Sequence, residues 1–209
     1  MYKVQTYGNQ DSDTAIVVPI SADREEETMK TVNILLDRAK TDCKVCLVIE
    51  EKGWSGWVAA HNWAFKNIPC KYYCYSCGDY YPSRRFLLLA KKEIEDFGIK
   101  LVAFNDGKWY GAIATAGLVD VEWAKQNYNG ELFYPGYKHH YADTELSMHA
   151  INQGLMAYNP DAVLMEIDYE DKFKGSGFIY QPDNHLFKRR CNEFRKTKKI
   201  KEKILDIYS

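Results

Sequence analysis

Residues 72–86 read YYCYSCGDYYPSRRF, and this stretch decides which kind of fold the chain adopts. Its first half is apolar and aromatic, which predicts a buried strand. Pro82 is suited to the first turn of a following helix. Between the strand and the helix, either the Cys74-x-x-Cys77 pair or Asp79 would hold a metal ion. The two choices define two different proteins.

Apolar runs alternate with helical patterns on both sides of this stretch. The predicted strands are residues 15–20, 44–49, 71–77, 101–104 and 163–167, and the predicted helices are residues 23–39, 57–67, 82–97, 121–125, 143–154 and 187–207. Asp23 and Glu26 predict a capping-box start for the first helix, and Asn-Asp-Gly at 105–107 predicts the turn of a small hairpin. This alternation predicts an α/β fold with a mixed, mostly parallel sheet flanked by helices.

The chain has 209 residues, a formal net charge of −1 and six cysteines. No apolar run approaches the roughly 20 residues that a membrane-spanning helix requires. The first ten residues contain no apolar segment typical of a secretory signal. Cysteines in a chain without export indicate free thiols in a reducing compartment. We therefore expect a cytoplasmic protein with no transmembrane segment.

The C-terminal part differs from the rest in charge. Residues 188–203 contain nine Lys or Arg and two Glu, a local charge of +7, so the remainder of the chain carries −8. We expect a main domain over 1–185 and a basic amphipathic helix over 186–209 that packs on this domain or extends from it. Such a segment is typical of contact with an anionic partner, either nucleic acid, an anionic glycan or a charged membrane surface. The alternative is a docked terminal helix with a solvated basic face.

Cys43-x-x-Cys46 and Cys74-x-x-Cys77 have the spacing of a four-thiolate zinc site. The surrounding sequence opposes this interpretation. Cys46 lies within an apolar strand, and Cys74 and Cys77 are three residues apart, so on an extended strand they face opposite sides. We favour small buried hydrophobic residues. The zinc alternative would make the chain a non-catalytic, zinc-stabilised nucleic-acid-binding module.

Asp79 follows a predicted strand and precedes a predicted helix, which is where ligands bind in an open α/β sheet. A carboxylate there could share Mg²⁺ or Mn²⁺ with a diphosphate, because these cations take one or two carboxylates plus phosphate oxygens. The alternative is that Asp79 is only a turn or helix-cap residue.

Five segments in order resemble the A-type (GT-A) glycosyltransferases, in particular the large glycosyltransferase family 2. They are AIVVPISADR (15–24), VCLVIEE (45–51), WVAAHNWAF (57–65), SCGDYYPS (76–83) and HHYADTEL (139–146). The resemblance covers roughly residues 15–167. It implies a Rossmann-like fold, a nucleotide-sugar donor, a divalent cation and transfer of a hexosyl or pentosyl group to an acceptor hydroxyl.

The resemblance also implies roles for individual residues. Asp143 would be the catalytic base, which implies inversion at the anomeric carbon, and Asp79 the metal-binding carboxylate. The donor-binding residues would be Pro19, Ser21, Arg24, Glu50 and Asn62. On the acceptor side we expect Trp109, Tyr110, His139, His140 and Glu145. The alternatives are a core role for the aromatic residues and an exposed, non-functional role for the histidines.

The sequence departs from the family pattern at the metal site. Cys77 stands where the family has the first acid of its Asp-x-Asp motif. The late histidine ligand is replaced by MEIDYED, which offers Glu166 and Asp168, and His185 is a further possible ligand. A transferase that binds nucleotide without turnover is therefore a second alternative.

Asp143 stands at the start of a predicted helix. The partial positive charge of a helix N-terminus would lower the pKa of this carboxyl and make it a weaker base. The alternative role of Asp143 is that of a simple helix N-cap.

Overall fold

The structure is a computed structural model that describes residues 1–51, 53, 55–166 and 180–209. The ligand candidate Asp168 and the last residue of the predicted strand 163–167 lie outside the described residues.

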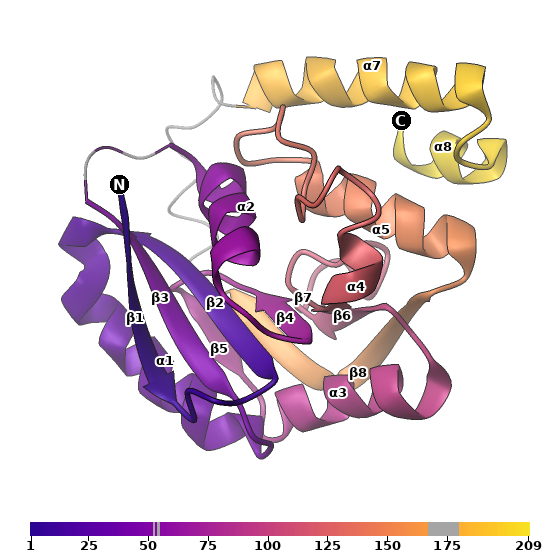
Figure 1. Cartoon of the computed structure of the whole chain (residues 1–209). Coiled ribbons are helices and arrows are strands. Elements are labelled where there is room, and N and C mark those ends of the chain that lie inside the picture. Colours follow the sequence, from indigo (N-terminus) through magenta and orange to yellow (C-terminus); the bar gives the residue numbers. More distant parts are fainter. Residues whose placement is uncertain (52, 54, 167–179) are drawn as a thin grey trace.

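One mixed sheet organises the described part of the chain, in the order β1-β3-β2-β4-β7-β6-β8-β5 (Figure 1). The strands are β1 (Tyr2–Gly8), β2 (Thr14–Ser21), β3 (Lys44–Glu50), β4 (Tyr72–Tyr75), β5 (Tyr80–Pro82), β6 (Leu101–Asn105), β7 (Gly117–Asp120) and β8 (Met156–Glu166). Strands β3, β2 and β4 are parallel neighbours, as are β6 and β8, whereas β1, β7 and β5 run antiparallel to theirs. The mixed, mostly parallel sheet is confirmed.

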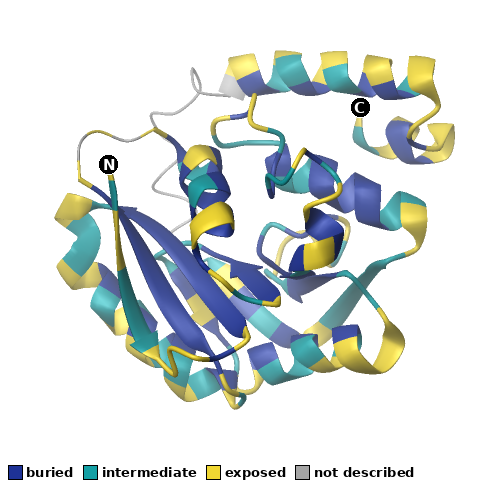
Figure 2. Ribbon diagram, viewed as in Figure 1, coloured by how far each residue is buried: buried dark blue, intermediate teal, exposed yellow. Residues whose placement is uncertain are grey.

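Helices cover both faces of this sheet (Figure 1). They are the 3-10 turn η1 (Ala22–Arg24), α1 (Glu25–Ala39), α2 (Trp57–Asn67), α3 (Phe86–Phe97), α4 (Val121–Ala124), α5 (Ala142–Gln153), α7 (Tyr180–Thr197) and α8 (Glu202–Tyr208). Helices α1 and α3 close one apolar core, and α2, α4, α5, α7 and α8 close the other. Strands β2 and β3 are buried over almost their whole length (Figure 2).

The alternation of side chains along β2 explains its continuous apolar sequence. Ala15 and Val17 pack into the core beneath α2 and α5, whereas Ile16 and Val18 pack into the core beneath α1 and α3. A strand buried on both faces needs apolar residues at every position. The prediction of a buried central strand is thus confirmed.

One strand was missed, and two local predictions are wrong. Strand β1 was not anticipated, because it is a half-exposed edge strand without an apolar run. Pro82 belongs to β5 rather than to a helix, and helix α3 begins at Phe86, after Arg85 in the left-handed conformation (φ 68°). Proline is tolerated there because β5 is the last strand of the sheet. The predicted cap at Asp23 belongs to a 3-10 turn, and α1 begins only at Glu25.

The predicted hairpin is confirmed as a strand pair but not as a tight turn. Strands β6 and β7 are antiparallel neighbours, with Ala103 opposite Gly117. Residues 106–116 join them as a wide loop, because Asp106 bonds to the loop itself. Its carboxylate accepts hydrogen bonds from the backbone N–H groups of Lys108 and Trp109 and from the Thr115 hydroxyl.

The C-terminal region contains two helices instead of one over 187–207. The break between α7 and α8 follows Lys198, which has a φ of 53°. Helix α7 already begins at Tyr180, and Phe187, Cys191 and Phe194 are buried in the core that α5 shares. Within the described residues, no helix is long and apolar enough to cross a membrane.

Candidate active site at the carboxyl ends of the strands

The sheet opens between β2 and β4 at their carboxyl ends. Their pairing stops at Val17 and Tyr75, and the last bond runs from the Ser76 N–H to the Val17 carbonyl. Strand β2 continues to Ser21 beside β3 alone, so Pro19 needs no N–H toward β4. Because β3 and β4 flank β2 on opposite sides, this opening is the switch point where open α/β sheets bind ligands.

Two predicted donor-side residues, Ser21 and Glu50, lie at this rim. They are register partners on β2 and β3. The buried Glu50 carboxylate accepts hydrogen bonds from the backbone N–H and the hydroxyl of Ser55, at 2.8 and 3.1 Å. Glu50 therefore fixes Ser55, two residues before α2. Arg24 follows Ser21 in η1, half-exposed, and forms an ion pair with Glu27 at 3.3 Å.

The Asn62 side chain forms hydrogen bonds to the backbone within the fold. Its amide nitrogen donates to the Phe133 carbonyl at 3.0 Å, and its amide oxygen accepts from the Phe133 N–H at 2.9 Å. The side chain is buried and joins α2 to the loop before α5. A donor contact by Asn62 would require both bonds to break, so we withdraw it from the donor set.

Asp79 lies directly after the opening, on the turn between β4 and β5. Gly78 packs beside Ile20 of β2, and its carbonyl accepts a hydrogen bond from the Thr31 hydroxyl at 2.8 Å, which fixes the turn against β2 and α1. Asp79 is half-buried, and its Oδ1 atom is fully buried. Asp79 therefore lies on the turn that follows the opening, and its role as a metal ligand stays a prediction.

Strand pairing brings Glu166 opposite Tyr80, the residue that follows Asp79. Tyr80 and Glu166 are register partners on β5 and β8, so their side chains lie on the same face. Burial raises the pKa of the Tyr80 phenol, and Cys77, Glu166 and Asp143 raise it further. Cys77, Glu166 and Asp143 thus all act on the Tyr80 phenol. His185 is exposed on α7.

Asp143 lies in the first turn of α5, after Tyr141 as the N-cap residue, so Asp143 itself is not the cap. Burial raises the pKa of this carboxyl to about 6, despite a hydrogen bond from the Thr144 N–H at 2.8 Å that acts in the opposite direction. The predicted lowering of the pKa is therefore wrong, because desolvation outweighs the helix terminus. A carboxylate with this pKa is ionised at neutral pH and is a stronger base than an exposed Asp.

Asp106 is a residue of the site that the sequence did not single out. Its charge makes a small contribution to the raised pKa of Asp143, so the two carboxylates interact electrostatically. The loop is tied to α5 because the Ala114 N–H donates to the Ser147 hydroxyl, which in turn donates to the Asp143 carbonyl. The available sequence signal is an Asp in a turn sequence, whose carboxylate can accept from the backbone N–H groups two and three residues later. The same signal describes an ordinary turn.

Trp109 and Tyr110 extend from this loop into solvent, with 43% and 69% of their surface exposed. Neither is part of the core, so the alternative of buried packing residues does not apply to them. The loop that carries them is attached to α5 at Ala114 and Ser147.

The two histidines of the loop before α5 are positioned by α7. The buried Asp183 carboxylate accepts hydrogen bonds from the N–H groups of Lys138, His139 and His140. Burial lowers the pKa of both imidazoles, to about 4 for His140. Both are therefore neutral at pH 7 and half-buried.

Glu145 does not face an acceptor. It is completely buried, and its carboxylate accepts bonds from Arg190 of α7 at 2.6 and 3.1 Å and from the Tyr137 hydroxyl at 2.8 Å. This arrangement attaches α7 to α5. The expected acceptor role of Glu145 is wrong, because Arg190 and Tyr137 use its oxygens.

The four cysteines of the zinc interpretation do not converge. Cys46 belongs to the core beneath α2 and α5, whereas Cys43 and Cys74 belong to the core on the other face of the sheet. Burial raises the pKa of the Cys74 thiol above its usual range, and that of Cys43 to about 11. In the described part of the chain, no three His, Cys, Asp or Glu side chains could hold a metal ion by themselves.

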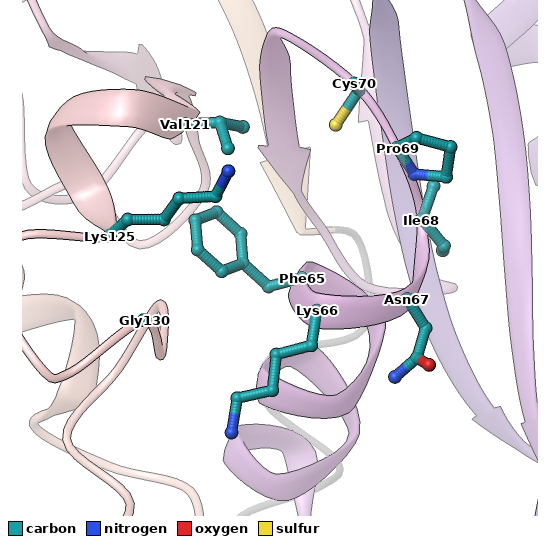
Figure 3. Close-up of a pocket in the computed structure, with 9 residues that line it drawn as sticks. All are labelled: Phe65, Lys66, Asn67, Ile68, Pro69, Cys70, Val121, Lys125 and Gly130. Carbon is teal, nitrogen blue, oxygen red and sulfur yellow. The ribbon is translucent and has the colours of Figure 1, made fainter.

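A separate pocket lies at the opposite ends of the strands, where the chain enters β4 (Figure 3). Phe65 and Cys70 line it together with Lys66 and Lys125. Lys66 pairs with Glu131, and Lys125 pairs with Glu122. Because both cations have acidic partners and no carboxylate of the rim is near, this pocket is not part of the candidate active site.

No protein-family model matches the sequence, and comparison with curated proteins finds no similar sequence. Solved structures do match. The mannosyltransferase PcManGT from Pyrobaculum calidifontis, solved with GDP-Man and Mn²⁺, aligns with a TM-score of 0.54 at 16% identity, over 77% of this chain and 59% of that one. S. aureus TarS aligns with a TM-score of 0.58 at 12% identity, over 87% of this chain and 43% of that one.

A shorter form of TarS, in complex with UDP, aligns with a TM-score of 0.51 at 14% identity, over 73% of this chain and 60% of that one. The chain thus has the GT-A-like fold of glycosyltransferases. It spans 43% to 60% of the length of these three structures.

Proposed function

We propose that the protein is a glycosyltransferase that moves a sugar from a nucleotide-sugar donor to an acceptor hydroxyl. One observation carries the proposal: at the carboxyl ends of the strands, Glu166 pairs across the sheet with Tyr80, Asp143 acts on the same phenol, and Asp79 directly precedes Tyr80 in the chain. These ends form the ligand side of an open α/β sheet. The GT-A-like fold supports the same activity.

Asp143 is the proposed base. It takes the proton of the acceptor hydroxyl while the acceptor oxygen bonds to the anomeric carbon. The bond from that carbon to the donor diphosphate breaks, and the nucleoside diphosphate leaves with the electron pair. Attack from the side opposite the leaving group inverts the anomeric carbon. A pKa of about 6 leaves Asp143 ionised at pH 7 and able to accept this proton.

The residues at the rim fit a divalent cation in part. Asp79 offers a carboxylate, and Glu166 on β8 lies opposite Tyr80, the residue after Asp79. Cys77 stands where a second acid would be expected. Mn²⁺ and Mg²⁺ commonly bind through one or two carboxylates plus substrate phosphate oxygens. Asp79 and Glu166 would hold the cation, which would neutralise the leaving diphosphate.

We propose that Ser21, Arg24 and Glu50, beside Pro19, form the nucleotide side of the site. Ser21 and Glu50 end neighbouring strands, and Arg24 follows in η1. Asp79 is on the turn that packs against the end of β2, so a diphosphate bound there would extend from the nucleotide side toward Asp143.

The acceptor side is proposed to consist of Trp109, Tyr110, His139 and His140. Exposed aromatic rings next to a base suit a sugar ring, which stacks on aromatic faces through its C–H groups. We propose a glycan hydroxyl as the acceptor. The basic segment suggests an alternative acceptor, a modified DNA base, and in that case the sugar would be transferred to duplex DNA.

A thermal-shift panel of nucleotide sugars, with and without Mn²⁺, tests this function. A donor at about 100 times its Kd stabilises the folded state by about 2.7 kcal/mol, which raises Tm by several degrees. We expect a shift with one class of nucleotide, larger with Mn²⁺, which Asp79→Asn removes. Absence of a shift with every donor would contradict the proposal.

Cys77 favours a second candidate, a GT-A-like protein that binds nucleotide without transfer. Cys77→Asp separates the two. If the natural protein is active, it releases nucleoside diphosphate with an acceptor present, and the substitution changes mainly its metal dependence. If only the Cys77→Asp variant releases the product, the binding-only function is correct.

A further inference from the structure

The two C-terminal helices and the turn between them carry a concentrated positive charge. Seven of their cations are exposed, and they are Lys188, Arg189, Lys196, Lys198, Lys199, Lys201 and Lys203. We call this set the basic surface. Among residues 1–51, 53, 55–166 and 180–209, none of the seven forms an ion pair with an acidic side chain. The outer side of α7 is accordingly exposed (Figure 2).

The acidic residues of the same region are engaged elsewhere. Glu193 pairs with Arg190 at 3.3 Å, and Glu202 and Asp206 pair with Arg195 at 2.6 and 3.3 Å. Asp183 is buried against backbone N–H groups. The two arginines that these acids contact do not belong to the basic surface, and with nine Lys or Arg against four Asp or Glu, residues 180–209 keep a net charge of +5.

The C-terminal part of the basic surface, from Lys196 onward, lies away from the candidate active site. The Lys199 carbonyl accepts a hydrogen bond from Asn152, near the C-terminal end of α5. Asp143 is in the first turn of that helix, about 14 Å away at 1.5 Å per residue. Figure 1 shows α7 along α5, with α8 near the distal end.

The composition of the basic surface favours a membrane over nucleic acid. Six of its seven cations are lysines, whereas arginine is the residue that reads base edges in a bidentate manner. Ile207 follows Lys203 by one turn of α8 and is 73% exposed, so an apolar contact accompanies the charge. Among residues 181–209, no aromatic residue is exposed for stacking on a base.

We propose that the basic surface attaches the protein reversibly to bilayers that contain anionic lipids, through its seven cations and Ile207. The apolar side of α7 is buried against α5, so the helix does not insert into the bilayer. Clusters of four to eight Lys or Arg are sufficient for such attachment at the lipid surface. The proposal is independent of the proposed enzymatic function.

Co-sedimentation with vesicles tests it, using phosphatidylcholine alone and phosphatidylcholine mixed with phosphatidylglycerol. The full chain should bind only the mixed vesicles and should dissociate at about 1 M salt, where the Debye length is about 3 Å. Each lysine contributes about a fivefold change in partitioning. The triple variant Lys188→Gln, Lys196→Gln, Lys203→Gln should therefore bind about 100-fold more weakly.

The matched control is Lys3→Gln, Lys30→Gln, Lys92→Gln, which removes the same charge from exposed positions elsewhere. It should bind anionic vesicles nearly as well as the natural chain. Ile207→Ser should weaken vesicle binding and leave any binding to duplex DNA unchanged. No sedimentation with the mixed vesicles would overturn the proposal. So would equal loss in both triple variants, or tighter binding to duplex DNA than to vesicles.

Discussion

Asp143 is the residue on which the proposed chemistry depends, and its environment gives it a pH signature. Its pKa of about 6 predicts that kcat/KM rises with pH below 6 with a slope of one proton and levels off above it. Asp143→Asn should lower kcat by about 10² to 10⁴, the usual contribution of a general base. A pH–rate profile checks both. An unchanged profile in the Asn variant would assign the base to another residue.

The same raised pKa predicts that the stability of the fold decreases with rising pH, whereas the activity increases. Burial of the ionised carboxylate is unfavourable, so the folded state keeps its proton to about pH 6, while the unfolded state loses it near pH 4. Wild-type stability therefore falls as pH rises from 4 to 6, and Asp143→Asn avoids that loss. Urea denaturation at pH 8 should show the variant more stable by about 1 to 3 kcal/mol. A variant less stable than wild type at pH 8 would mean that Asp143 serves the fold.

At the scale of the element, α7 is held to α5 by the buried pair of Glu145 and Arg190. Arg190→Met should cost about 3 to 5 kcal/mol, because it leaves the Glu145 carboxylate buried without its cation. Arg195→Met on the same helix is the matched control. Its partners Glu202 and Asp206 are exposed, so it should cost less than about 1 kcal/mol. Equal losses in chemical denaturation would show that the Glu145 pair has no special role.

Helix α7 also orders the loop that precedes the base. Asp183→Ala would leave the N–H groups of His139 and His140 without their acceptor, at a cost of about 1 to 3 kcal/mol in the free energy of unfolding. Asp183→Asn keeps one acceptor oxygen and should cost less. Asp96→Ala, an exposed position on α3, should change stability by less than about 0.5 kcal/mol. Urea denaturation of the three variants checks this order, and an Asp183→Ala variant as stable as the control would contradict it.

The elements differ in how well the sequence predicts them. Strands β2 and β3 were predicted almost to the residue, because burial on both faces requires an unbroken apolar run. Strand β5 was not predicted, because its three residues form an edge strand that is defined by pairing with β8, 82 to 86 residues later in the chain. The break between α7 and α8 was missed because the apolar pattern continues through it.

Site residues follow the same rule. Asp79 and Asp143 could be singled out because each follows or opens a regular element, and their roles stay predictions. Asn62 and Glu145 were assigned wrongly, since their partners, Phe133 and Arg190, come from segments that approach only in the folded chain. The raised pKa of Asp143 depends on burial, which the position at a helix start does not reveal.

For the whole molecule, the central claim is that a cation-bridged diphosphate binds at the opening between β2 and β4, facing Asp143. A crystal structure with Mn²⁺ and the nucleoside diphosphate selected by the thermal-shift panel tests it most directly. We predict an anomalous Mn²⁺ peak at about 2.1 Å from an Asp79 oxygen, in contact with the diphosphate. A diphosphate bound at the other end of the sheet, or a cation held by residues distant from Asp79, would contradict the account.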